Sequence, residues 1–283
     1  MTVLPDFIII GAMKSATTTL HRQLSRQSGI FMCAEKEPNF FSNDEIYAKG
    51  LSWYGALFES APPGSLKGES STHYTKLPTY PHTVERIAQT IPNPRLIYIM
   101  RHPIRRLVSQ YKHQWLEGEI TCDIVSAVSR HPELVDYSRY AFQLAPFFEA
   151  FGSRAVLPVI FESLRLNPQA ELERICRFIG YQGHPTWHPS LAHENDSSTR
   201  VRRFHGYELL VESRLATALR RLLVPKGVRN KIRGAFSVEN DIALPQHLER
   251  QLQTLFDDDL VSLSDWVGFH FSTRSFDTLQ CQR

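Results

Sequence analysis

The segment that most constrains the fold of this chain lies near its N-terminus and reads FIIIGAMKSATTTLHRQL, from residue 7 to residue 24. Its first four residues are apolar and predict a buried strand, whereas the spacing of Leu20 and Leu24 predicts a helix over residues 17–27. Gly11 and Lys14 lie in the turn between them. A strand that turns directly into a helix presents free backbone N–H groups and the positive end of the helix dipole. The segment therefore predicts an anion-binding turn that favours phosphate.

Apolar runs alternate with amphipathic helical patterns over the first two thirds of the chain. The expected strands are 65–70, 95–100 and 155–161, and the expected helices are 81–91, 103–116 and 168–179. Pro158 indicates an edge strand or a bulge, whereas Asn167 and Gly180 are typical of the residues that flank a helix. This alternation predicts an α/β fold in which a central parallel sheet is covered by helices on both faces.

The C-terminal third has a different character. From about Pro185 to Asp241 the sequence is polar, basic and irregular, which predicts a flap over the carboxyl edge of the sheet. A final helix is expected over about 245–263. No domain boundary is evident despite this change in character, and the chain is expected to form a single domain over residues 1–283.

Composition limits the partners and the compartment. The 32 basic and 29 acidic residues give a net charge of only +3, and the basic runs lack interleaved aromatic residues, which argues against nucleic-acid binding. Four cysteines without CxxC spacing predict free thiols in a reducing compartment. The first ten residues lack a basic leader segment, and no stretch approaches the ~20 apolar residues of a membrane span. A cytoplasmic protein is expected, and its oligomeric state stays open.

The turn after residue 10 differs from the loop of nucleoside-triphosphate enzymes. That loop reads GxxxxGK[ST], with a glycine directly before the lysine and a magnesium-binding hydroxyl after it. Here only two residues separate Gly11 from Lys14, and Met13 precedes the lysine. The lysine by itself is therefore weak evidence for a kinase, and a purely structural turn stays an alternative at this point.

A second motif, IMRHPIRRLVSQYKH, spans residues 99–113. An expected strand ends at Arg101, the chain turns at Pro103, and Ser109 lies on the following helix. Ligands of an open parallel sheet bind beyond the carboxyl ends of its strands, so Arg101 and Ser109 can reach one anion there. The rigid fork of arginine suits a phosphate, although Arg101 alone could equally cap a helix or pair with a carboxylate.

Together the two motifs resemble those of sulfotransferases that use 3′-phosphoadenosine 5′-phosphosulfate (PAPS), and most closely the carbohydrate branch that includes heparan sulfate sulfotransferases. The resemblance covers about residues 5–182 and implies a P-loop-like three-layer fold. The family's GxxKxGTTxL segment binds the 5′-phosphosulfate and is matched by Gly11, Ala12, Met13, Lys14, Ser15, Ala16, Thr17, Thr18, Thr19 and Leu20. Its RxPxxRxxSxY segment binds the 3′-phosphate and is matched by Arg101, Pro103, Arg106, Ser109 and Tyr111.

The chain departs from the family pattern at three places. Ala16 replaces the usual glycine of the first motif. Ser70, in the segment GESSTHY that resembles EKTPxYF, replaces a lysine, so that a positive charge is missing or is supplied by Lys36 or Lys76. The family's late basic loop has no clean counterpart, and Arg202 or Arg200 within NDSSTRVRR is the nearest candidate for a cofactor contact.

The resemblance also implies the chemistry. A sulfuryl group would pass from PAPS to an acceptor hydroxyl by in-line displacement, with Lys14 neutralising the leaving phosphate. Glu37, in KEPNFFS, matches the acidic position of the glycan branch and is the expected base; His73 is the rival, because other branches use a histidine. The acceptor is expected to be a glycan or a small molecule, and no metal ion is expected.

Two other functions stay open. A small-molecule P-loop kinase would need magnesium and a strand-end aspartate, where this chain has Arg101. A nucleotide-binding homologue that has lost its activity is the second, motivated by Ala16 and Ser70. The basic residues between 214 and 233 are either a solvated helix face or a contact for an anionic acceptor.

Overall fold

The computed structural model describes residues 2–191, 242–268 and 270–280. Its centre is a five-stranded, fully parallel sheet with the order β2-β3-β1-β4-β5. The strands are β1 (Phe7–Gly11), β2 (Ile30–Met32), β3 (Leu66–Ser70), β4 (Leu96–Met100) and β5 (Val156–Ile160). The α/β fold with a parallel sheet is thus confirmed. Pro158 lies in the edge strand β5, as its missing N–H predicts.

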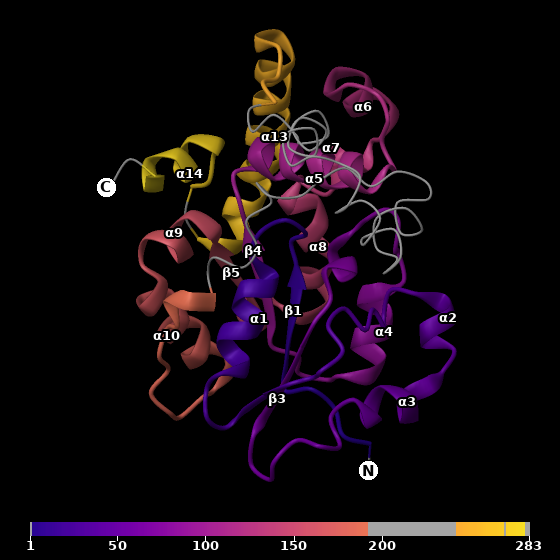
Figure 1. The fold of residues 1–283 in the computed structure, drawn as a ribbon, viewed down its shortest axis with the longest axis vertical. Helices are drawn as coiled ribbons and strands as arrows, with labels where there is room; N and C mark the ends of the chain where they lie inside the picture. Colours follow the sequence, from indigo (N-terminus) through magenta and orange to yellow (C-terminus); the bar gives the residue numbers. More distant parts are fainter. Residues whose placement is uncertain (1, 192–241, 269, 281–283) are drawn as a thin grey trace, which may run out of the picture.

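Helices cover both faces of the sheet (Figure 1). They are α1 (Thr17–Ser25), α2 (Asp44–Tyr47), α3 (Gly50–Ala56), α4 (Thr83–Thr90), α5 (Pro103–Glu117), α6 (Ile124–Arg130), α7 (Glu133–Asp136), α8 (Tyr140–Phe151), α9 (Phe161–Leu166), α10 (Pro168–Ile179), α13 (Gln246–Val267) and α14 (Thr273–Gln280). Short 3₁₀ turns are η1 (Thr72–Thr75), η2 (Ser153–Ala155) and η3 (Pro189–Leu191).

The strand residues alternate between two apolar cores. Phe7 and Ile9 of β1 pack with α1, α9 and α10, whereas Ile8 and Ile10 pack with α3, α4, α8 and the C-terminal half of α13. Because the central strands are apolar on both faces, they read as continuous hydrophobic runs. This explains why β1 and β4 are evident in the sequence.

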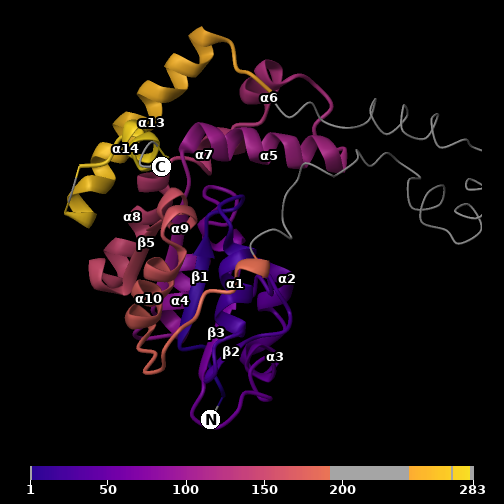
Figure 2. The same cartoon turned by 60° about the vertical axis from the view of Figure 1, so that its left-hand side comes forward.

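A third apolar cluster lies beyond the carboxyl ends of the strands. It joins α5, α6 and α7 to the first half of α13, through Leu107, Leu134 and Phe256 among others. Figures 1 and 2 both show α5 crossing above the tip of β1. The helix that carries the second motif is therefore held over the edge of the sheet at which the first motif lies.

Several expectations need correction. The strand β2 and the short helices α2, α3, α6, α7 and α9 were not predicted, and neither was α14. Asn167 occupies the N-cap of α10 but its side chain makes no cap hydrogen bond. The final helix α13 runs to Val267, four residues beyond the expected end.

Some expectations fall on residues outside the described ranges. Cys33, Cys122 and Cys176 are free thiols, as predicted, whereas Cys281 lies outside the described residues. Most of the predicted flap, 192–241, also lies outside them. The single domain over 1–283 and the cytoplasmic location stay predictions. Among the described residues, no helix combines the length and apolar character that a membrane crossing needs.

Candidate active site

The predicted anion turn begins at Gly11, the last residue of β1. A Cβ at this position would lie 2.1 Å from the Thr75 hydroxyl oxygen and 2.7 Å from the Tyr98 ring. That hydroxyl donates a 2.7 Å hydrogen bond to the Ile10 carbonyl, which holds η1 against the end of β1. Only glycine allows this close approach, so Gly11 has a packing role beneath the turn.

Two residues of the turn adopt the left-handed conformation. Lys14 has φ 68° and Ala16 has φ 66°, and they flank the buried Ser15. Ala16 is the N-cap residue of α1 and provides no side-chain cap, so the first-turn amides remain available to a ligand. A glycine would adopt this conformation without strain, whereas alanine pays about 1 kcal/mol. Ala16 thus adopts a left-handed conformation at the position where the family motif has glycine.

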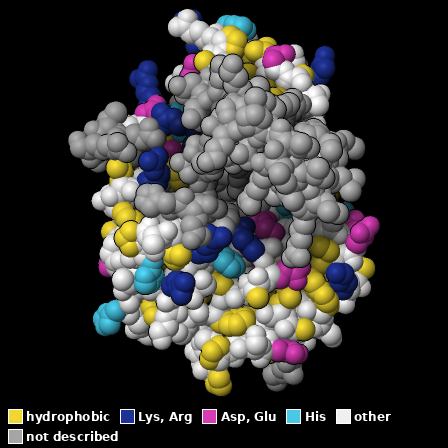
Figure 3. Space-filling model, viewed as in Figure 1, with side chains coloured by type: hydrophobic (Ala, Val, Ile, Leu, Met, Phe, Trp, Pro, Cys, Tyr) yellow, Lys and Arg dark blue, Asp and Glu magenta, His cyan; other side chains and the backbone are white. Residues whose placement is uncertain are grey.

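The hydroxyl residues of the first motif are not equally exposed. Thr17 and Thr19 are buried, and Thr18 is half-buried, as are Met13 and Lys14. Figure 3 shows Lys and Arg side chains gathered near the middle of the face that Figure 1 presents, where the strands end. Positive charge and first-turn amides therefore occur together at this edge of the sheet.

Arg101 joins the second motif to the first. It follows β4 directly, and its Nη1 donates to the Lys14 carbonyl oxygen at 3.4 Å. Its guanidinium carbon lies 5.0 Å from the centroid of the Phe161 ring. Burial lowers the pKa of Arg101, which Glu162 opposes, and the side chain stays charged at neutral pH. Ser109 lies two turns further along α5 and is half-buried. The two motifs are thus in contact, through the Arg101 guanidinium and the Lys14 backbone carbonyl.

Two other positions of the second motif, which were not assigned as cofactor contacts, are held by hydrogen bonds within the fold. Arg106 is fully buried and donates to Ser138 Oγ at 2.6 Å, to Gln110 Oε1 at 2.8 Å and to the Leu134 carbonyl at 2.9 Å. The Tyr111 hydroxyl donates to the Cys122 carbonyl at 2.9 Å. These residues hold α5 against the segments that follow it.

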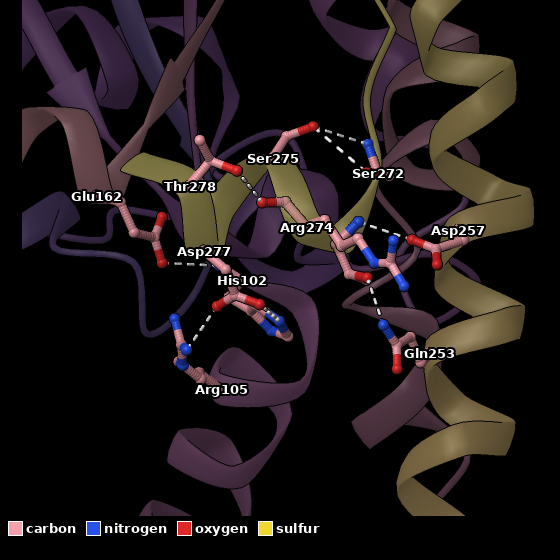
Figure 4. A network of polar contacts seen from close by, with 11 residues as sticks. His102, Arg105, Glu162, Gln253, Asp257, Ser272, Arg274, Ser275, Asp277 and Thr278 are labelled. Carbon is pink, nitrogen blue, oxygen red and sulfur yellow. Dashed lines mark hydrogen bonds and ion pairs between the residues drawn. The ribbon is translucent and has the colours of Figure 1, made fainter. Parts of the chain in front are cut away.

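The C-terminal helix α14 is fastened to the start of α5 (Figure 4). Asp277 accepts a 2.6 Å hydrogen bond from Arg105 and lies 3.7 Å from His102 Nε2. The backbone N–H of His102 donates to Glu162 at 3.1 Å. Burial lowers the pKa of His102 to about 4, and Arg105 acts in the same direction. The neutral His102 therefore links α5 to α9 and α14.

Glu37 lies at the carboxyl end of β3. Its backbone N–H donates to the Ser70 carbonyl at 3.0 Å, and its Oε2 accepts from the Thr72 N–H at 2.8 Å and the Thr72 hydroxyl at 2.9 Å. Lys36 Nζ lies 2.6 Å from Oε1. Although burial works in the opposite direction, the Lys36 charge and these hydrogen bonds hold the pKa of Glu37 below its usual value. Glu37 is therefore a carboxylate at neutral pH.

Backbone strain marks the same two loops. Within the described ranges, the non-glycine residues with positive φ are Lys14, Ala16, Glu37 and Asn39. Such conformations cost of order 1 kcal/mol or more and persist where the surroundings enforce them, often at functional sites. The strain coincides with the loops that the sequence assigns to donor binding and to base catalysis.

A buried carboxyl group, Glu69, supports the Glu37 loop from below. The Tyr54 and Tyr74 hydroxyls each donate to its Oε1 at 2.8 Å, and the Ser71 hydroxyl donates to Oε2 at 2.9 Å. The same Ser71 oxygen accepts from the Asn39 N–H at 3.0 Å. Burial raises the pKa of Glu69 to about 7. Glu69 thus positions the loop and does not face the acceptor.

Ser70, which stands where the family segment EKTPxYF has a lysine, pairs with the neutral side chain of His21. Ser70 Oγ lies 2.8 Å from His21 Nδ1, and both side chains are buried. Burial lowers the pKa of His21 to about 4, and the Lys36 charge adds to the effect. Lys36 is placed on Glu37, and Lys76 lies beyond η1. Sequence reasoning missed His21, whose only signal is its position one helical turn after Thr17.

The rival base, His73, lies beside Glu37's partner Thr72. Its ring stacks on Tyr80 with centroids 4.8 Å apart and 15° between the planes. Burial lowers the pKa of His73 to about 4, and Lys76 lowers it further. At neutral pH His73 is uncharged.

Arg200 and Arg202 lie outside the described residues, so their contact with a cofactor stays a prediction. Over residues 2–191, 242–268 and 270–280, no group of three or more His, Cys, Asp or Glu side chains is arranged to hold a metal ion. The described part of the site is thus built from cations, backbone amides, carboxylates and neutral histidines.

Sequence comparison finds similarity to a known family over part of this chain. A profile of the sulfotransferase family matches residues 64–185. The membrane-associated sulfotransferase kil1 of Dictyostelium discoideum is 38% identical over 119 residues, which cover 40% of this chain and 24% of that protein. The mouse heparan sulfate glucosamine 3-O-sulfotransferase 3B1 is 32% identical over 189 residues, covering 62% and 46%. The human bifunctional heparan sulfate N-deacetylase/N-sulfotransferase 2 is 27% identical, covering 62% and 22%. The chain thus spans about a quarter to a half of these relatives' lengths.

Solved structures share the fold. A sulfotransferase from Alicyclobacillus acidocaldarius superposes with a TM-score of 0.66 at 19% identity, over 97% of this chain and 99% of that one. The mouse sulfotransferase SULT7A1, complexed with PAP, gives a TM-score of 0.53 at 14% identity, over 99% and 89%. Over residues 64–185 this chain is thus similar in sequence to the sulfotransferase family, and its fold is that of solved sulfotransferase structures.

Proposed function

We propose that this protein is an enzyme that transfers a sulfuryl group from PAPS to an acceptor hydroxyl. The observation that carries the proposal is the meeting of the two motifs, in which Arg101 contacts the Lys14 carbonyl at the carboxyl edge of the sheet. PAPS is anionic at two separate ends, the 5′-phosphosulfate and the 3′-phosphate. The turn at 11–19 suits the first, and Arg101 with Ser109 suits the second.

The chemical step follows from the placement of these groups. The acceptor oxygen attacks sulfur, the bond from sulfur to the bridging phosphate oxygen breaks, and the electron pair leaves with the bisphosphate. Lys14 and the first-turn amides of α1 stabilise the charge that develops on that oxygen. Glu37 takes the proton of the hydroxyl and is ionised at neutral pH, as this role requires.

A carbohydrate acceptor is the finer part of the proposal. It is supported by the relatives named as heparan sulfate sulfotransferases, which match 62% of this chain. It is also supported by the Glu37 loop, which Glu69 and Ser71 hold at the carboxyl edge of the sheet. The kinase alternative lacks this support, because β4 ends at Arg101, where a strand-end aspartate would be needed.

Nucleotide binding tests the proposal directly. Adenosine 3′,5′-bisphosphate at a hundredfold excess over its Kd is expected to raise the Tm by about 5–10 °C. Adenosine 5′-monophosphate, which lacks the 3′-phosphate, is the matched control and is expected to raise it less. Stabilisation by ATP with magnesium alone would reject the proposal in favour of a kinase.

Turnover separates an enzyme from an inactive homologue. Sulfur-labelled PAPS is supplied with a panel of glycans, phenols and small alcohols, and label in an acceptor is the expected result. Tight bisphosphate binding without transfer to any member of the panel would favour the inactive homologue.

A further inference from the structure

Lys76, directly after η1, is a half-buried lysine whose charge is not matched by a carboxylate. Among the described residues, no carboxylate oxygen lies within 4.0 Å of its ammonium group. What the ammonium does meet is the Tyr137 ring, whose centroid is 5.8 Å away. Burial lowers the pKa of Lys76 to about 8, Glu37 opposes this shift, and Arg106 adds to it. An ammonium group in this position is short of compensating negative charge.

Such an arrangement costs free energy in the absence of a ligand. A charge withdrawn from water without a partner is unfavourable, and buried cations are ordinarily paired. Perturbed titratable groups in a site are candidates for function. A ligand that brings an anionic group to Lys76 would supply the missing partner.

A pair of stacked rings lies close to Lys76 in the sequence. His73 and Tyr80 stack nearly parallel, with centroids 4.8 Å apart, and both are half-buried. The Tyr137 hydroxyl lies 2.5 Å from the Thr79 hydroxyl, which fixes the ring that Lys76 contacts to the segment that carries Tyr80. The side chains of His73 and Tyr80 are therefore uncharged, partly exposed rings on the same segment as the ammonium group.

The same residues adjoin the proposed base. Thr72, which donates two hydrogen bonds to Glu37, directly precedes His73. The Glu37 charge opposes the lowering of the pKa of both His73 and Lys76. An acceptor held on His73, Lys76 and Tyr80 would therefore present its hydroxyl near Glu37.

We propose that His73, Lys76 and Tyr80 form an acceptor subsite, in which Lys76 binds a carboxylate or sulfate of the acceptor and the His73 and Tyr80 rings contact a ring of the acceptor. This inference rests on the proposed function and adds the chemical class of the acceptor, an anionic molecule with a ring that is either a sugar or an aromatic group. The subsite also gives Lys76 a role, in a site where Ser70 replaces a lysine of the family motif.

Two matched pairs of probes test the subsite, each in the presence of saturating adenosine 3′,5′-bisphosphate and again without nucleotide. Methyl β-D-glucuronide is compared with methyl β-D-glucoside, and 4-hydroxybenzoate with phenol, by calorimetry or ligand-observed NMR. In at least one pair the carboxylate is expected to bind roughly tenfold more tightly, as a charge-assisted hydrogen bond would provide. The pair that shows the preference distinguishes a sugar from an aromatic acceptor.

Variants assign the preference to the subsite. Lys76→Met is expected to abolish the difference within the pair, and Tyr80→Leu to weaken both members. Lys49→Met is the matched control, because Lys49 also lies over an aromatic ring, with its Nζ 4.6 Å from the Trp53 centroid, but outside the site. Equal binding of charged and neutral probes, no binding of either carboxylate, or a preference that survives Lys76→Met would each overturn the subsite. Failure of the bisphosphate to bind would instead count against the proposed function, and the comparison without nucleotide would still decide the subsite.

Discussion

Replacement of Lys14 by methionine is expected to lower kcat for sulfuryl transfer by about 10²–10³-fold, the typical loss when one preorganised charge-stabilising group is removed. The affinity for adenosine 3′,5′-bisphosphate is expected to fall much less. Negative charge on the leaving oxygen is greatest in the transition state, so the ammonium group acts more strongly there than on bound donor. Methionine has a side chain of similar length. Because lysine and methionine both have a Cβ, the conformational free energy of adopting φ 68° is about the same for both.

Measuring both kcat and the affinity for the donor distinguishes a role of Lys14 in the chemical step from a role in binding. Lys49→Met removes a lysine from the surface outside the site and is expected to leave both quantities unchanged. Equal losses in donor affinity and rate would assign Lys14 to binding alone. An unchanged kcat would show that Lys14 takes no part in the chemical step.

Glu37→Gln is expected to lower kcat by about 10²–10⁴-fold, the range that general-base catalysis contributes. Glutamine can still accept the Thr72 hydrogen bonds through its amide oxygen, so the loop should keep its position. It cannot take a proton at neutral pH. Glu35→Gln is the matched control, because Glu35 is an exposed carboxylate two residues away in the same loop.

The pH dependence follows from the lowered pKa values. Deprotonated Glu37 is the active form, so activity should stay constant with respect to this group near neutral pH and fall only below the ordinary glutamate value of 4.5. A His73 base, with a pKa of about 4, would give a similar acid limb. The pH profile alone therefore does not distinguish the two. His73→Ala does, since it is expected to keep kcat within several-fold at saturating acceptor, whereas retained turnover in Glu37→Gln would transfer the role away from Glu37.

Features that depend on local sequence were predictable. The strand, turn and helix of 7–24 are adjacent in the chain, and the apolar run of β4 ends visibly at Arg101. Parallel strands bring their carboxyl ends to one edge, so fold class alone places the two motifs at the same edge of the sheet. The contact between the two motifs is observed.

Features that depend on tertiary packing were not predictable. Arg106 matches the family motif, but the sequence gives no sign that it is buried and bonds to Leu134 and Ser138. The pairing of His21 with Ser70 joins residues 49 apart in sequence. The four-residue helices α2 and α7 are too short to show a helical period. The partial burial of Lys76 likewise arises from segments far apart in the chain.

The central claim is that one nucleotide spans the two motifs, and a crystal structure with adenosine 3′,5′-bisphosphate tests it most directly. The 5′-phosphate is expected on the first-turn amides of α1 within hydrogen-bond distance of Lys14 Nζ, with the 3′-phosphate on Arg101 and Ser109. A bisphosphate bound with its two phosphates elsewhere, or with Lys14 directed away from the 5′-phosphate, would contradict the claim.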